Sequence, residues 1–186
     1  MERLKQLFSV KNIALNGIIA GLYAAITIAC GPLSYEFMQL RFSELLNLLV
    51  FFNPAFTVGL TLGCLIANLF SSVGPIDIVF GTLTTLVACL VMIGYSKLVK
   101  NLFTTGLIPC LLNAVVVPFT IVVSTMGTND AIPLTFANYF MMFGWVFLGE
   151  FVCINLIGYP IFLVLSKRYS GFYKSILATR NTDYKW

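Results

Sequence analysis

The sequence predicts an all-α integral membrane protein, a single bundle of six transmembrane helices over residues 1–186 with both termini in the cytoplasm. Of the residues, 59% are hydrophobic and 10% are charged, whereas a soluble domain has roughly 45–50% apolar and about 25% charged residues. The mean hydropathy is +0.95. Six spans of about 20 residues each would use most of the 186 residues. No room remains for a soluble nucleotide-binding or catalytic domain.

Apolar runs predict the helices in order. The first helix covers 13–30. The next run, 45–70, contains Asn53-Pro54, and proline suits the first turn of a new helix but not a helix interior, so we expect a break there. The break gives two predicted helices, 42–52 and 54–70. The other predicted helices are 78–96, 104–126 and 138–165, and a cytoplasmic tail follows at 167–186.

Basic residues determine the number of spans and their orientation. With six spans and the N-terminus inside, 10 of the 11 basic residues are cytoplasmic, whereas five spans would leave 3 inside and 8 outside. The positive-inside rule therefore favours six spans. The ten are Arg3, Lys5, Lys11, Lys97, Lys100, Lys167, Arg168, Lys174, Arg180 and Lys185. The acidic residues Glu36, Glu44, Asp77 and Asp130 then lie at the outer ends of spans.

The N-terminal segment also resembles a signal peptide, because basic residues precede an apolar stretch. That stretch is longer than the apolar core of most signal peptides, so we expect the first helix to be retained. Removal of the first helix would leave five spans and, with the C-terminus in place, a less coherent distribution of charge between the two faces, which also favours retention.

The residue types present argue against enzymatic chemistry. Histidine is absent, which excludes HExxH zinc proteases and nucleophiles activated by histidine. Five cysteines lie in or beside apolar runs without CxxC spacing, so we interpret them as small core residues. We expect no metal, no cofactor and no enzymatic activity. The cysteines are Cys30, Cys64, Cys89, Cys110 and Cys153.

Small residues recur at four-residue spacing in two of the predicted helices, a pattern that lets helix backbones approach closely. The first helix has a broad band of them, and the third has a narrower stripe. For the third helix we favour packing within the bundle, whereas the first could equally dock a partner subunit. The first band is Gly17, Ala20, Gly21, Ala24 and Ala25, and the second stripe is Gly59, Gly63, Ala67 and Ser71.

Glu150 is the strongest functional candidate, because an ionised carboxylate in the middle of a span is costly. Counted from the outer helix ends, Glu150 and Asn113 both lie roughly 18–20 Å deep at about 1.5 Å per residue. We therefore expect them to meet. A carboxylate beside an amide suits a flat heterocycle with an N–H/NH₂ edge and a carbonyl. The alternative is an interhelical hydrogen bond with a protonated Glu150.

A second polar cluster is predicted at the outer mouth, between the first two helices and beside the fourth. It combines aromatic and charged side chains and is a candidate lid. Two structural alternatives remain open: Arg41 pairs with Glu44 across one helical turn, and Asp77 caps its helix. The cluster comprises Tyr35, Glu36, Phe37, Gln39, Arg41 and Glu44, together with Asn68 and Asp77.

Several segments carry a family resemblance. GPLSYEFMQLRFSELL at 31–46, GLTLGCLIANLFSSVGPIDIVFGTL at 59–83, Asn113 and LGEFVCINLIGYP at 148–160 resemble QueT-type queuosine-precursor transporters, which are substrate-binding S components of energy-coupling factor (ECF) importers. The family usually has glycine at the position of Glu36.

The resemblance implies a multi-pass protein of the bacterial cell membrane that captures a 7-deazaguanine outside, as the aminomethyl base, queuine or the nucleoside, and delivers it inside. Its partners would be an ECF transmembrane scaffold subunit and two cytoplasmic ATPases, with no role for nucleic acid. Glu150 would accept hydrogen bonds from the N1–H and 2-amino edge, Asn113 would face the carbonyl or a ring nitrogen, and Tyr35 or Phe37 would stack on the base.

Other functions stay open. The chain could be an S component for another small vitamin or nucleobase. A membrane-embedded enzyme and a passive scaffold or small channel are the alternatives from other classes.

Overall fold

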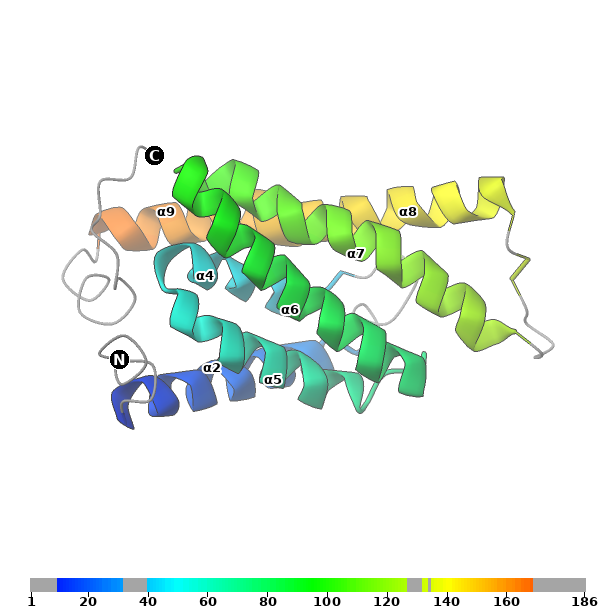
Figure 1. Ribbon diagram of the computed structural model, residues 1–186, viewed down its shortest axis with the longest axis horizontal. Coiled ribbons are helices and arrows are strands. Elements are labelled where there is room, and N and C mark those ends of the chain that lie inside the picture. The colour runs from blue at the N-terminus through cyan, green and yellow to red at the C-terminus, as the bar shows by residue number, and fades with distance from the viewer. Residues whose placement is uncertain (1–9, 32–39, 127–131, 134, 169–186) are drawn as a thin grey trace.

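The computed structural model describes residues 10–31, 40–126, 132–133 and 135–168. All regular elements in this part of the chain are helical, and helices lie at each of the six predicted places (Figure 1). In order they are α2 (Val10–Ala29), η1 (Phe42–Leu48), α4 (Leu49–Phe52), η2 (Pro54–Phe56), α5 (Thr57–Asn68), α6 (Pro75–Leu98), α7 (Leu102–Thr125), α8 (Phe136–Phe151), η3 (Val152–Gly158) and α9 (Tyr159–Arg168).

The predicted break at Asn53-Pro54 is confirmed. Asn53 is extended, with φ −140° and ψ 105°, and its side chain accepts a hydrogen bond of 3.0 Å from the backbone N–H of Ala55. Pro54 occupies the first helical position, where a missing N–H has no cost. The chain therefore reverses between α4 and α5, which form an antiparallel hairpin (Figure 1).

The helices differ in their ability to cross a bilayer. Among the described residues, four helical stretches are long and apolar enough to span, namely Val10–Ala29, Pro75–Leu98, Leu102–Thr125 and the continuous Phe136–Arg168. Phe42–Phe52 and Pro54–Asn68 are apolar but shorter. Four helices of full length and one hairpin of two short apolar helices thus occupy the six predicted places, and six spans stay a prediction.

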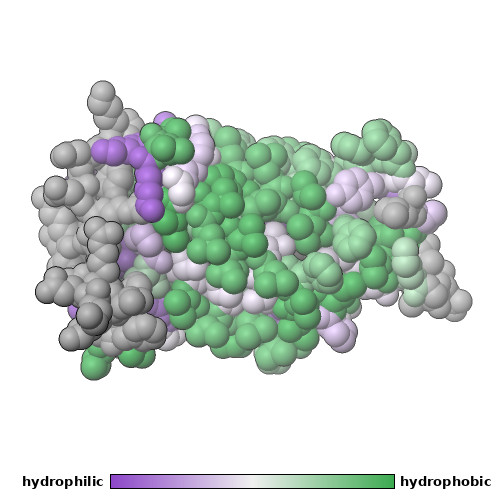
Figure 2. All heavy atoms as spheres, in the orientation of Figure 1, coloured by the Kyte–Doolittle hydropathy of each residue, from purple (hydrophilic) through white to green (hydrophobic). Residues whose placement is uncertain are grey.

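The two ends of the bundle differ in charge. The start of α2, the α6–α7 connection and the end of α9 lie at one end, on the left in Figure 1. Figure 2 shows a broad apolar surface between the two ends. Apart from Arg41, the basic residues in the described ranges belong to the left-hand end. They are Lys11, Lys97, Lys100, Lys167 and Arg168.

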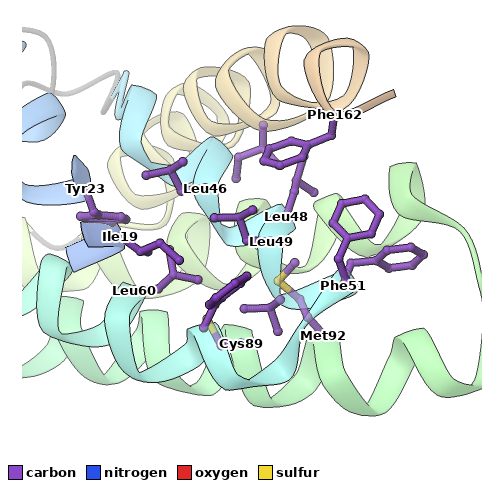
Figure 3. Packing of buried hydrophobic residues seen from close by; sticks show 14 of the residues in the cluster. Ile19, Tyr23, Leu46, Leu48, Leu49, Phe51, Leu60, Cys89, Met92 and Phe162 are labelled. Carbon is purple, nitrogen blue, oxygen red and sulfur yellow. The ribbon is translucent and has the colours of Figure 1, made fainter. Parts of the chain in front are cut away.

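The short segment 42–52 forms the centre of the apolar core. Leu48, Val50 and Phe52 are fully buried, and the ring of Phe52 packs against Phe162 of α9 with centroids 5.8 Å apart. Figure 3 shows Leu48 and Leu49 of this segment in one cluster with Tyr23 of α2 and with residues of α5 and α6. Four cysteines are buried as free thiols, which confirms their interpretation as core residues. They are Cys64, Cys89, Cys110 and Cys153.

The small residues of α5 pack against α2. A Cβ atom added to Gly63 would lie 2.7 Å from Cβ of Tyr23, and one added to Gly59 would lie 2.6 Å from the carbonyl oxygen of Asn16. Asn16 also accepts a hydrogen bond of 2.6 Å from the backbone N–H of Gly59. Packing within the bundle, the favoured interpretation of this stripe, is confirmed.

Candidate functional site

Glu150 and Asn113 meet as the depth count predicts. Nδ2 of Asn113 on α7 donates a hydrogen bond of 2.8 Å to Oε1 of Glu150 on α8. Glu150 is 1% exposed and Asn113 5% exposed. The carboxylate is therefore held by a neutral donor in an apolar interior, where its second oxygen also requires a donor.

The helix that carries Glu150 changes its winding directly after this residue. Residues Val152–Gly158 form a π-helical segment, η3, between α8 and α9. Such segments are rare and often occur at functional sites. Within it, the buried Asn155 donates to the backbone oxygen of Phe103 at 2.8 Å, so this turn is fixed to α7.

Glu44 lies in a second buried polar group formed by α2 and η1. Its two carboxylate oxygens accept hydrogen bonds from the Tyr23 hydroxyl and from Nδ2 of Asn47. η1 is a 3-10 helix with three residues per turn, so residues 41, 44 and 47 share one face. Glu44 is 1% exposed and Asn47 is fully buried.

Arg41 links this face to α5 and α6. Its guanidinium donates to Oδ1 of Asn68 at 2.6 Å and forms a salt bridge of 3.5 Å with Asp77. The capping interpretation of Asp77 is wrong, because the N-cap of α6 is Gly74, with φ 84°, and Asp77 lies in the first turn. Its carboxylate there benefits from both the helix dipole and Arg41.

The two groups form one electrostatic unit. The carboxylates of Glu44 and Glu150 act on one another electrostatically. Arg41 is the basic group that acts on both. We call Glu44 and Glu150 the acidic pair. It brings together α2, η1, α7 and α8.

Two acceptor atoms beside the acidic pair lack a hydrogen-bond partner in the described part of the chain. They are Oε2 of Glu150 and Oδ1 of Asn47, both completely shielded from solvent. An unsatisfied buried acceptor costs about 1–3 kcal/mol. A molecule that brings N–H donors to this place would remove that cost.

The other predicted residues have mixed outcomes. Tyr35, Glu36, Phe37 and Gln39 lie outside the described residues, so the predicted lid stays a prediction. Arg41, Asn68 and Asp77 form a buried network. Glu44 is also buried but bonds to Tyr23 and Asn47.

The small-residue band of α2 divides into two parts. Gly17, Gly21 and Ala25 are exposed, and the two glycines have open space beyond them. Ala20 and Ala24 are each 6% exposed, and the backbone of Ala20 lies against Gly63 of α5. A partner helix would therefore contact the first three and not the last two.

Sequence reasoning missed Tyr23, Asn47 and Asn155. Each is a polar side chain inside an apolar run, the same signal that identified Glu150 and Asn113. Applied to every polar residue within a span, that criterion would have found Asn47 and Asn155. Tyr23 carries less signal, because tyrosine is common in membrane helices.

An apolar groove of about 460 Å³ lies elsewhere, between α2, the start of α5 and the later part of α6. Its lining includes Asn16, Gly17, Pro54, Leu90 and Ile93. None of the residues around the acidic pair contributes to it. The groove is therefore a surface feature separate from the candidate site.

Comparisons with known proteins agree with this architecture. The family model "QueT transporter" matches residues 13–167. The chain is 32% identical over 163 residues to a protein of Lactococcus lactis subsp. cremoris (strain MG1363) named "Queuosine precursor transporter QueT", and the match covers 84% of this chain and 93% of that protein. No solved structure matches. A transporter family and several apolar helices describe a multi-pass protein of the cell membrane. The chain belongs to the QueT transporter family.

Proposed function

We propose that this chain is the substrate-binding S component of an ECF-type importer, and that it carries a 7-deazaguanine precursor of queuosine into the cell. The proposal rests above all on the acceptor-rich site at Glu150, whose Oε2 has no partner among the described residues. The 7-deazaguanine ligand class comes from the name of the Lactococcus relative and from the sequence resemblance.

Glu150 is the residue proposed to recognise the base by accepting its hydrogen bonds. The N1–H and the 2-amino group of a 7-deazaguanine are two adjacent donors, which a carboxylate accepts together. Asn113 donates to the other side of the same carboxylate at 2.8 Å and thus holds its plane. Binding would satisfy Oε2 and offset the cost of burying the charge.

The decisive experiment measures binding by Glu150→Gln. The substitution keeps the shape but replaces one acceptor with a donor, so affinity for 7-aminomethyl-7-deazaguanine should fall at least about tenfold. Leu148→Met on the same helix, at a position 51% exposed, is the matched control and should bind normally. Unchanged affinity in a folded Glu150→Gln protein would falsify the assignment.

A different ligand is the main alternative within the same class of transporter. Competition with guanine-type bases, flavin, biotin and thiamine on the purified protein separates the two. Mass spectrometry of the molecule retained during purification gives an independent answer.

We propose that the exposed small residues of α2 dock the ECF scaffold subunit, which in turn carries two ATPases. Gly17, Gly21 and Ala25 are exposed, and Gly17 adjoins the apolar groove. A small-residue stripe allows a partner helix to approach closely. Gly21→Leu should abolish copurification with the scaffold but leave ligand binding intact, and Gly94→Leu, at a site also without neighbours within 4 Å, is the control.

The proposal includes six spans with both termini in the cytoplasm. The segment 42–52, which is buried in the core, and α5, which keeps an exposed apolar face, contribute the second and third. The segregation of basic residues to the end that holds Val10 and Arg168 supports this orientation.

A further inference from the structure

The apolar groove beside α5 is separate from the acidic pair and has no role in the proposed binding of the base. The start of α5 forms its floor, and α2 and α6, which both pack against α5 (Figure 1), form its walls. Apolar side chains of all three helices line it, among them Ile13, Val58, Leu62 and Ile93. Because these helices belong to the membrane domain, the groove faces the bilayer, where acyl chains or another protein cover apolar surface.

The size of the groove favours an acyl chain over a helix. Its volume is about 460 Å³. A helix with its side chains is about 10–12 Å across with a pitch of 5.4 Å, so two turns fill roughly 850–1,200 Å³. A partner helix would therefore enter the groove only in part, whereas a single acyl chain is narrow enough to lie within it.

Lys97 provides a positive charge at the basic end of the groove. It follows Ile93 by four residues and Leu90 by seven, so it lies on the same side of α6 as these two lining residues and one turn beyond them. Lys97 is exposed and has no ion-pair partner among the described residues. An anionic group at the mouth of the groove would complete this charge.

Thr57 provides a hydroxyl at a deeper level. The hydrogen bond of 3.2 Å between Thr85 and Cys64 sets the antiparallel register of α5 and α6. In that register Thr57 is level with Met92, about 7.5 Å along the helix axis from Lys97.

The Thr57 side chain lines the groove, is 8% exposed and has no hydrogen-bond partner for Oγ1 within the described ranges. Oγ1 is shielded, but threonine has two χ1 rotamers in helices, and a change of rotamer exchanges the hydroxyl with the methyl group. Asn16, also in the lining, already uses its amide in bonds to Asn12 and Gly59.

We propose that the groove holds one acyl chain of an anionic phospholipid, with its phosphate bound by Lys97 and an ester carbonyl bound by the Thr57 hydroxyl. This inference goes beyond the proposed function and does not depend on it. In a phospholipid the ester groups lie between the phosphate and the chains, and Thr57 likewise lies between Lys97 and the apolar part of the lining. A lysine at the membrane surface attracts anionic lipids, and the apolar walls bury the chain.

The test titrates two phospholipids into the full-length purified protein in detergent and follows the bound molecules by native mass spectrometry. They are phosphatidylglycerol, which is anionic, and phosphatidylcholine, which is zwitterionic, with identical chains. One lysine at the surface corresponds to roughly fivefold in affinity, so the first phosphatidylglycerol should bind more tightly by that factor. Lys97→Gln should bring the ratio close to one. Lys167→Gln, also in the last turn of a helix, is the control and should leave the ratio unchanged.

Val58→Trp tests the groove itself. Val58 is 59% exposed, so a larger side chain there fills the groove without entering the core. The affinity for both lipids should fall at least about tenfold. Val164→Trp on α9, at a position 56% exposed, is the matched control and should bind normally. If Val58→Trp does not fold, Leu62→Trp serves instead.

Thr57→Val tests the hydroxyl. The substitution keeps the shape of the side chain and removes its donor, so the affinity for both lipids should fall by the same factor, roughly twofold to tenfold. An unchanged affinity would show that the ester carbonyl is not bound at Thr57.

Two results would overturn the inference as a whole. Equal affinity of the wild-type protein for the two lipids, or equal effects of Lys97→Gln and Lys167→Gln, would mean that no anionic headgroup is recognised at this groove. Undiminished lipid binding by Val58→Trp would place the lipid elsewhere on the protein. Neither result bears on the ligand of the acidic pair.

Discussion

The side-chain amide of Asn113 donates a hydrogen bond of 2.8 Å to Oε1 of Glu150 and so joins α7 to α8 inside the bundle. Pro109 and Pro118 lie on either side of Asn113 in α7, and each removes a backbone donor from the helix. The same bond orients the Glu150 carboxylate, which is the proposed hydrogen-bond acceptor for the ligand.

A double-mutant cycle tests the strength of this bond. Interhelical hydrogen bonds in membrane proteins average about 0.6 kcal/mol and reach about 1.7 kcal/mol, so Asn113→Ala and Glu150→Ala should show a coupling in that range. Unfolding of the purified protein in detergent gives the free energies. Asn113→Ala combined with Trp145→Ala, at a site 45% exposed, is the control pair and should be additive. Additivity in the first pair would mean that the contact contributes nothing.

The meeting of these two residues was predictable because helix geometry is regular. A fixed rise per residue converts positions in the sequence into depth, and the outer ends of both helices were recognisable. The Asn53-Pro54 break was predictable for a similar reason, since proline has few allowed positions in a helix. Local rules of this kind carry over directly from sequence to structure.

The association of Glu44 with Tyr23 and Asn47 could not be derived in this way. It depends on a 3-10 winding of residues 42–48, which aligns residues at a spacing of three, and on the tight approach of α5 to α2. It also depends on where η1 sits between helices that are distant in the sequence. The π-helical segment after Glu150 has no sequence signal that we could identify.

The approach of α5 to α2 predicts a strong effect of one added methyl group. In Gly63→Ala the new Cβ would lie 2.7 Å from Cβ of Tyr23 and 2.8 Å from the backbone oxygen of Ala20, so the helices must separate. Overpacking of this kind costs about 1–3 kcal/mol. The midpoint of thermal unfolding should therefore fall.

Gly94→Ala is the matched control for Gly63→Ala. Gly94 is in the helical interior of α6 with no neighbour within 4 Å, so alanine should stabilise the protein by up to about 1 kcal/mol through its higher helix propensity. Equal effects of the two substitutions would contradict the close packing at Gly63.

The Arg41–Asp77 salt bridge predicts a non-additive pair of substitutions. Both side chains are buried at a separation of 3.5 Å, and removal of one partner from such a pair costs up to about 3–5 kcal/mol, because an uncompensated charge remains. Arg41→Gln and Asp77→Asn should each destabilise the protein. The double variant should recover most of the loss, since its two amides carry no charge. A double variant as unstable as the sum of the two would argue against the pairing.

The orientation of the chain predicts a selective labelling of Cys30. Cys30 follows the last residue of α2 and is partly accessible, whereas Cys64, Cys89, Cys110 and Cys153 are each fully buried. In the proposed topology the start of α2, with Lys11, faces the cytoplasm, so its other end faces outwards. A membrane-impermeant maleimide added to intact cells should therefore label the protein once per chain. Cys30→Ser should abolish that signal, and denaturation should expose the four remaining thiols.

Labelling of Cys30 that occurs only after the cells are opened would show that the bundle has the reverse orientation. The acidic pair would then have to be loaded from the cytoplasmic side, which is incompatible with an importer.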